Sequence, residues 1–423
     1  VGELRCLRRL AWARLLGAVS GDSLEQWADQ MDEHRRHYNN LVENFKKETN
    51  VKAHDPNLCN PLSRNSNNPF LKIQVNEDLL REIWKDVERT FPECEFLSSA
   101  ESRKVLQRML FHWCRSMNPS SNASDSYRQG MNELVAVIFS VVKQGEYAGG
   151  SWESAEALGT RLCGSGHNEA DAYILFSRLM DHGLRAMFMN SGRASARPSK
   201  SPIGDLPRSF FSGRGPAEQG PPGSAILARC QFIFDQVLHC MDEDLHTHLK
   251  KLEIEPQVFL LRWLRLLFCR EFELEETYLL WDGLFATAGR PAPPGALQYA
   301  QCTGAPAEAA VVREAAEASA ALPLVDFTAV ALLRTMRGEL LSLDQTDCLR
   351  RLLSGCAAND ATHLVDTARK LQAAGGAPVQ RNLSARRRLC FDRHQQLRLK
   401  AKRQACRLRL RSWRTPFEES RSS

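Results

Sequence analysis

Apolar residues recur along most of this 423-residue chain at intervals of three and four, the period of one face of an α-helix. The clearest apolar stripes are Leu80, Ile83, Trp84 and Val87; Leu134, Val135, Ile138, Val141 and Val142; Ile226, Cys230, Ile233, Val237 and Met241; and Val258, Leu261, Leu264 and Phe268. Residues 278–285 and 327–341 follow the same period, and alternating runs bounded by turns are lacking. The pattern predicts an all-α fold.

The first stripe belongs to a helix that we expect to begin at Asn76, a good N-cap, and to end near Phe91, just before Pro92. At about 100° per residue, Arg89 falls on the side opposite the apolar stripe. Asp86 precedes it by three residues, close enough on a helix to form an ion pair and set its direction. An exposed arginine is usually only a solvated charge, so Arg89 alone indicates little.

The second stripe follows a loop rich in Ser, Asn and Asp between residues 118 and 126. Tyr127 and Gln129 therefore lie where the loop becomes a helix. Free N–H groups at a helix start suit phosphates. In the alternative interpretation, Gln129 does no more than cap the helix, as polar loop residues often do, and Tyr127 packs beneath it.

Together these segments resemble a known family. Ile83-x-x-Asp86-x-x-Arg89 followed by Tyr127-x-Gln129-Gly130-Met131, with Arg89 and Gln129 40 positions apart, is similar to the TBC-domain family of Rab GTPase-activating proteins. The ordered set of motifs, rather than any one of them, carries the resemblance. It continues through Glu169-x-Asp171-Ala172-Tyr173, Leu261-Arg262-Trp263, Arg270-Glu271-Phe272 and Leu280-Trp281-Asp282. It covers about residues 7–353 and is closest to the member 5 branch.

The resemblance implies that the chain completes the active site of a partner GTPase and turns over no substrate of its own. Arg89 would be an arginine finger, and Gln129 would orient the attacking water in place of the GTPase's own glutamine. Asp86 would hold Arg89, while Tyr127 and Gly130 would shape the glutamine loop. The implied partner is a GTP-bound Rab protein, which carries the GTP and Mg²⁺, so the chain needs no cofactor and no metal of its own.

Two further residues of the motifs, Arg262 and Trp263, are assigned supporting roles at the site. Trp263 lies in an apolar helix, where a tryptophan is more often core than contact. Arg262 either touches the site or braces it, and the sequence leaves both open.

Composition fits a globular protein, since 43% of residues are hydrophobic and 25% charged. The cysteine pattern indicates reduced thiols. The 13 cysteines contain no C-x-x-C pair, and no histidine pair has partners at zinc-site spacing. No P-loop, dinucleotide-binding turn or nucleophile elbow is present. Because the chain begins at Val1 rather than Met, we expect it to be a fragment or a truncated gene model.

We expect one large helical domain over residues 1–355, a linker over 356–380 and a basic tail over 381–423 that is partly helical or disordered. Gly-, Pro- and Ala-rich stretches at about 191–224 and 287–323 predict two long, largely disordered insertions within the domain.

The tail has a distinct charge. Residues 381–414 contain 13 Lys and Arg and one acidic residue, a net charge of +12, whereas the chain totals +6, so the remainder carries −6. Apolar residues interleave with the basic ones, which is compatible with an anionic membrane surface. Nonspecific nucleic-acid binding is a less favoured interpretation, and a solvated extension is the simplest.

The leading functional prediction is a Rab GTPase activator in endosomal and vesicle traffic, cytoplasmic and peripherally attached to membranes. The alternative is a helical adaptor that binds a Rab protein without accelerating hydrolysis; the presence of both Arg89 and Gln129 argues against it.

Overall fold

The computed structural model describes residues 2–48, 68–117, 126–147, 149, 153–188, 224–288, 310–355 and 360–375. Within these ranges every regular element is helical, which confirms the predicted all-α class. The first half of the chain forms α1 (Gly2–Leu15), α2 (Leu24–Glu48), α3 (Pro69–Val87), α4 (Glu95–Ser98), α5 (Ala100–Met117), α6 (Met131–Gln144), α7 (Glu153–Cys163), η3 (Ser165–His167) and α8 (Asn168–Leu179).

The second half continues with helices that include two π-helical segments, η4 and η6. They are η4 (Met180–Leu184), α9 (Arg185–Phe188), α10 (Ala225–Phe232), η6 (Ile233–Leu238), α11 (His239–Met241), α12 (Glu243–Lys251), α13 (Gln257–Arg265), α14 (Leu274–Phe285), α16 (Ala310–Ala321), α17 (Leu324–Thr335), α18 (Arg337–Leu340), α19 (Gln345–Leu353) and α20 (Ala361–Gly375).

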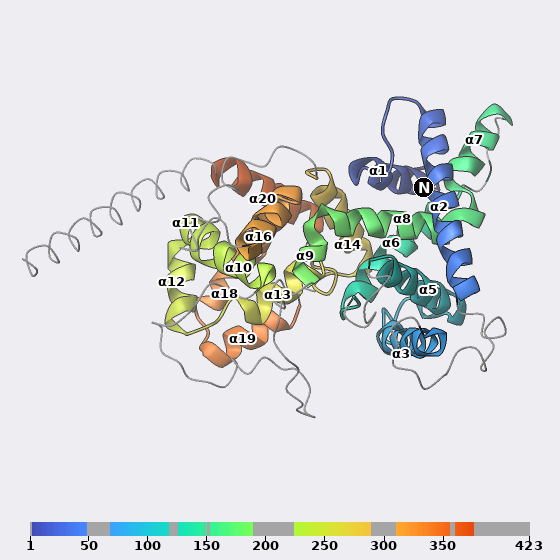
Figure 1. The fold of residues 1–423 in the computed structure, drawn as a ribbon. Helices are drawn as coiled ribbons and strands as arrows, with labels where there is room; N and C mark the ends of the chain where they lie inside the picture. Colours follow the sequence, from blue (N-terminus) through green and yellow to red (C-terminus); the bar gives the residue numbers. More distant parts are fainter. Residues whose placement is uncertain are drawn as a thin grey trace, which may run out of the picture.

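Helix α6 is the centre of the first half. Residues 131–142 are all buried, so the helix is covered on every side, and its few polar members, such as Asn132 and Glu133, are buried with the apolar ones. It packs against α8, α5 and α1, while α3 covers α5 and α2 covers α8. Figure 1 shows α1–α3 and α5–α8 on the right of the view and α10–α13, α16 and α18–α20 on the left, with α9 and α14 between them. One hydrophobic core cluster runs through both halves.

Two segments predicted to be a largely disordered insertion and a linker each contribute a packed helix. In the predicted insertion at 287–323, α16 packs against α10 and η4 and buries Ala315 and Ala318. In the predicted linker at 356–380, α20 packs against α17 and α14 and buries Leu364 and Val365. Both predictions are wrong for these residues, because alanine favours helix and its small side chain permits close packing. Most of the other insertion and the whole of the predicted tail, 381–423, lie outside the described residues.

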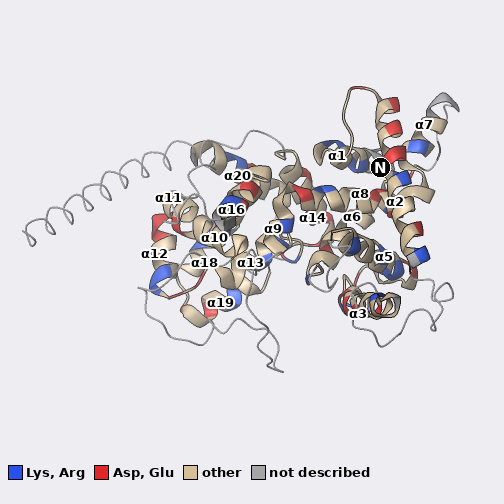
Figure 2. Cartoon of the chain, in the orientation of Figure 1, with Lys and Arg blue, Asp and Glu red and all other residues tan. Residues whose placement is uncertain are grey.

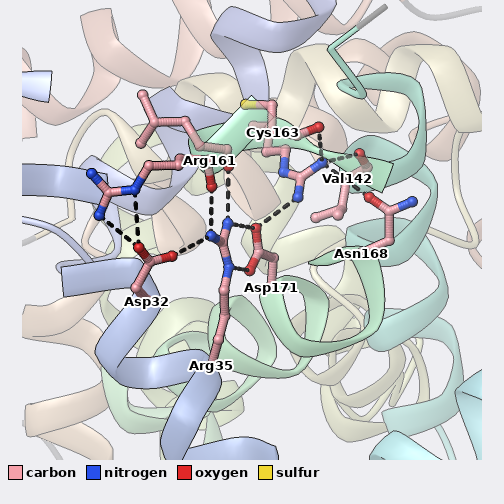
Figure 3. A network of polar contacts seen from close by, with 9 residues as sticks. Asp32, Arg35, Val142, Arg161, Cys163, Asn168 and Asp171 are labelled. Atoms are coloured by element: carbon pink, nitrogen blue, oxygen red, sulfur yellow. Dashed lines mark hydrogen bonds and ion pairs between the residues drawn. The ribbon is translucent and has the colours of Figure 1, made fainter. Parts of the chain in front are cut away.

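A buried ion-pair network joins four helices of the first half (Figure 3). The Asp171 carboxylate on α8 accepts Arg9 Nη2 from α1 at 2.6 Å and Arg35 Nε from α2 at 2.7 Å. Arg35 also donates to the carbonyl oxygens of Arg161 and Leu162 on α7. Because each guanidinium is buried with its partner, losing one member would leave a charge without compensation. Asp171 of the Glu169-x-Asp171-Ala172-Tyr173 motif therefore has a structural role.

Charged side chains lie over the helices in mixed sign, as the interspersed basic and acidic positions along α2 show (Figure 2). No single helix of the described ranges has the length and apolar composition to cross a membrane. One pair of helices, Arg313–Ala321 and Leu324–Thr335, meets the length and composition test together, but the two are bent by 81° and contribute to the hydrophobic core.

Candidate functional site

Arg89 lies just beyond the end of α3, and not on the helix face that the sequence predicted. The helix begins at Pro69, where Asn68 accepts a hydrogen bond from the Phe70 amide, seven residues before the predicted Asn76 cap. It ends at Val87, and Phe91 has a positive φ of 40° immediately before Pro92. The chain therefore turns between residues 88 and 91, and Arg89 extends from this turn.

Asp86 fixes the direction of Arg89. Its Oδ1 accepts a hydrogen bond from Arg89 Nη2 at 2.6 Å. The Asp86 side chain is only 11% exposed, whereas that of Arg89 is 57% exposed. No other ion pair or side-chain hydrogen bond joins Arg89 to the described residues. A buried carboxylate thus orients the guanidinium while its other nitrogens face solvent, as the predicted ion pair requires.

Gln129 lies on the turn that leads into α6. Gly130 is the N-cap residue, with φ of 105°, a conformation that favours glycine. A Cβ at this position would lie 2.7 Å from Leu266 Cδ2, so the space also excludes a side chain. Gln129 itself is exposed, and no hydrogen bond to the described residues holds its carboxamide. The turn therefore presents the amide outward from a fixed backbone.

A cluster of buried polar groups joins the turn of Arg89 to the turn of Gln129. The Tyr127 hydroxyl donates to Asp86 Oδ2 at 2.8 Å, and Asn132 Oδ1 accepts the Gly130 amide at 3.0 Å. Asn132 Nδ2 donates to Thr90 Oγ1 at 2.8 Å, and Thr90 Oγ1 donates to the Asp86 carbonyl at 2.7 Å. These contacts bring together four of the predicted residues: Asp86, Arg89, Tyr127 and Gly130.

Burial and the adjacent Asp86 carboxylate raise the pKa of Tyr127 well above its ordinary range, so its hydroxyl remains a donor. The sequence interpretation gave no role to Asn132 or Thr90. The signal was present, since an asparagine two positions after a glycine at a helix start can hold the glycine amide, and threonine can bond the carbonyl four residues earlier.

The first turn of α6 is held from a second side by Arg270. Its Nε and Nη2 donate to the two Glu133 oxygens at 2.6 and 2.7 Å. Arg270 is half-exposed and Glu133 is buried. Leu267 and Phe268, which precede Arg270, are both buried and both have positive φ, an uncommon conformation for apolar residues. A strained turn therefore presents Leu266 to Gly130 and Arg270 to Glu133.

The structure does not bring Arg262 and Trp263 together with the two turns. Arg262 donates from Nε and Nη2 to Glu271 and from both terminal nitrogens to the Leu353 carbonyl. Burial raises the pKa of Glu271, and Arg262 opposes that rise. Trp263 is buried against Phe259 and Phe268. In this structure both residues brace α13 and the turn after it.

In the described ranges, no three His, Cys, Asp or Glu side chains are grouped so that they could hold a metal ion. The candidate site consists of two exposed groups, the Arg89 guanidinium and the Gln129 carboxamide, on turns that the buried polar cluster holds. Such a pair can stabilise developing negative charge and orient a water molecule once a substrate is brought to it.

Comparison with known proteins identifies the family. The Rab-GTPase-TBC domain family matches residues 5–197 and 217–293, which is more than half of the chain, and the chain belongs to this family. The solved Ypt/Rab-GAP domain of Gyp1p has the same fold, with a TM-score of 0.54 and 18% identity over 88% of this chain and 89% of that one.

Among curated proteins, TBC1 domain family member 5 of Homo sapiens is 31% identical over 364 residues, covering 83% of this chain and 40% of that protein. TBC1 domain family member 5 of Mus musculus is 33% identical over 67% of this chain and 34% of the relative. TBC1 domain family member 5 homolog B of Dictyostelium discoideum is 24% identical over 66% of this chain. The chain thus spans 40% or less of these relatives' length.

Proposed function

We propose that the chain is a GTPase-activating protein for a Rab-family GTPase and supplies Arg89 and Gln129 to the partner's active site. One observation carries this proposal. Two exposed side chains of the required kinds, 40 positions apart, extend from turns that share one buried cluster around Asp86 and Tyr127. Family membership supports the reaction class.

In this mechanism the partner brings GTP and Mg²⁺, and the chain brings charge and orientation. The Arg89 guanidinium donates to the oxygens of the transferring phosphoryl group as negative charge develops there. The Gln129 carboxamide accepts from and donates to the attacking water, and so places it in line with the bond that breaks. The partner's active site remains the catalyst, and the chain completes it.

The buried cluster lowers the cost of assembling this site. Asp86 holds Arg89 by one oxygen while Tyr127 holds Asp86 by the other. Asn132 holds Gly130 and Thr90 at the same time. Because these partners are buried, the two turns are held before the GTPase arrives, and little conformational freedom is lost on binding.

The experiment is a phosphate-release assay with GTP-loaded, purified Rab proteins. The parent chain should accelerate hydrolysis by at least one of them, and both Arg89→Ala and Gln129→Ala should lose most of that acceleration, about a thousandfold for the arginine. Arg81→Ala, an exposed and ion-paired arginine on α3, is the matched control and should behave as the parent. Binding of a Rab protein without acceleration by the parent chain would favour the adaptor.

We propose further that the partner is an endosomal Rab and that the chain acts on the cytoplasmic face of vesicle membranes. The resemblance to the member 5 branch supports this choice. The positive charge of residues 381–414 suits an anionic membrane surface. Sedimentation with vesicles of phosphatidylserine and phosphatidylcholine, using the full chain and a chain ending at residue 380, tests the membrane contact; equal sedimentation of the two would contradict it.

A further inference from the structure

Arg265, the last residue of α13, is held in a fixed orientation. Its Nε donates to the Met187 carbonyl at 2.9 Å, and its guanidinium lies over the Phe188 ring, 5.9 Å from the centroid. One nitrogen and one face of the guanidinium are thus committed to α9. The two terminal nitrogens form no hydrogen bond with the described residues, and they are the pair that would meet a carboxylate in a forked contact.

The charge of Arg265 also lacks an acidic partner within the described ranges. Its neighbours on the same segment differ, since Arg262 pairs with Glu271 and Arg270 with Glu133. Arg128, which carries a charge of the same sign, lies close enough to act on Arg265. Burial lowers the pKa of Arg265, and the charge of Arg128 lowers it further. A partly buried guanidinium without a counter-charge is costly, and a carboxylate supplied from outside the folded chain would offset that cost.

Arg265 adjoins the glutamine turn. A Cβ built on Gly130 would meet Leu266 Cδ2 at 2.7 Å and Phe188 Cε1 at 3.6 Å, and Arg265 lies over that same phenylalanine. Arg128 directly precedes Gln129. The opposite side of the turn faces Asn132, and through it Asp86 and Arg89. The Gln129 turn is therefore linked through Asn132 to the segment that carries Arg89, and it contacts Leu266 and Phe188 next to Arg265.

We propose that Arg265, beside Arg128, receives an acidic side chain from the surface of the bound GTPase and so helps select which GTPase is accepted. This inference rests on the proposed function. A protein carboxylate fits better than the nucleotide, because the phosphoryl group belongs on the Arg89 side of Gln129. A carboxylate accepts two parallel N–H bonds from the free fork of a guanidinium, and its charge would offset that of Arg265.

The test uses the GTP-loaded Rab protein that the parent chain accelerates most, with KM and kcat measured separately. Arg265→Met should raise KM about tenfold and leave kcat within about twofold, since the contact is with the partner's surface. Arg265→Lys keeps the charge but not the fork or the bond to Met187, so it should recover only part of the loss. Arg350→Met, which removes the same charge from a highly exposed site on α19, should leave KM unchanged.

Two further measurements make the result decisive. The KM of the parent should rise more steeply with salt than that of Arg265→Met, because an ion pair is screened. Each exposed Asp and Glu of the Rab protein is changed in turn to Arg. At one position the resulting rise in KM should be relieved when the chain carries Arg265→Glu. This rescue also shows that the Arg265→Glu chain is folded. An unchanged KM in Arg265→Met, a loss confined to kcat, or the absence of any rescuing pair would overturn the proposal. The parent chain's own acceleration, measured first, shows whether the proposed function has failed instead.

Discussion

Tyr127 and Asp86 lie 41 positions apart in the sequence, and the Tyr127 hydroxyl donates to Asp86 Oδ2 at 2.8 Å inside the protein. The other oxygen of the same carboxylate holds Arg89 at the surface. A buried phenol therefore determines, through one carboxylate, where an exposed guanidinium points. The contact also ties the segment before α6 to the end of α3.

Tyr127→Phe should weaken GTPase activation without unfolding the chain. It removes one hydroxyl and leaves Asp86 Oδ2 buried and unpaired, which costs about 1–3 kcal/mol. Because Asp86 then holds Arg89 less firmly, we expect kcat for hydrolysis to fall about tenfold, less than for Arg89→Ala. Tyr173→Phe removes a hydroxyl whose contact is a 3.4 Å bond to Ser116, away from this cluster, and serves as the control. Equal effects of the two changes would show that Tyr127 acts on general stability alone.

Gly130→Ala should destabilise the glutamine turn. The new Cβ would meet Leu266 Cδ2 at 2.7 Å, and alanine would have to adopt φ of 105°. Strain and overpacking together should lower the free energy of unfolding by at least about 2 kcal/mol. Urea denaturation measures the loss, and Gly166→Ala, where a Cβ meets nothing within 4 Å, is the matched control.

The clash with Leu266 can be separated from the backbone strain. In the double variant Gly130→Ala with Leu266→Ala, the new methyl group has space but the φ value is unchanged. We expect the double variant to be less destabilised than the sum of its parts, with an interaction free energy of about 1 kcal/mol. Strict additivity would indicate that Leu266 does not close this position.

Asp171→Asn should be among the most damaging changes in the chain. Arg9 and Arg35 would remain buried with one charge fewer to compensate them, at a cost of about 3–5 kcal/mol. The midpoint of urea unfolding gives the loss. Asp32→Asn, at the exposed edge of the same network with a side chain 36% exposed, should cost about 1 kcal/mol or less. Similar midpoints for the two variants would contradict the structural role of Asp171.

Stability should fall as the pH is lowered, and His112 should contribute to the fall. Burial lowers the pKa of His112 from 6.5 to about 4. Between these two values the unfolded chain binds the proton and the folded chain does not, so stability is lost as pH falls through this window. At pH 5 the contribution is about 2 kcal/mol. Unfolding free energies at pH 7 and pH 5 should differ by less in His112→Gln than in the parent; equal differences would exclude His112 as a source.

The sequence predicted the helical class and the helix start next to Gln129 well, because both depend on local signals. The polar loop before Met131 marks the start of α6, which places Gln129 at a helix entrance as expected. The end of α3 was placed too late. The helix ends at Val87, where the Arg89 and Thr90 amides bond the carbonyls three residues earlier, and Phe91 has a positive φ before Pro92.

Other features could not be predicted from local pattern. The Asn132–Thr90 bond joins residues 42 positions apart, and the Arg270–Glu133 pair joins residues 137 apart, so each depends on how the helices meet. Helix α16 was missed because its alanine-rich sequence gives a weak apolar stripe, whereas α20 has a stripe, Leu364, Val365 and Leu371, but no local signal shows that it packs into the domain. Their packing against α10 and α17 stabilises them, and only the tertiary fold shows it.

One measurement tests the central claim most directly. A Rab protein whose own switch glutamine is replaced by alanine is loaded with GTP and mixed with the parent chain or with Gln129→Ala. If Gln129 orients the attacking water, the parent chain should still accelerate hydrolysis by this GTPase, and the Gln129→Ala chain should not. Loss of acceleration by the parent chain, or equal acceleration by both chains, would contradict the account.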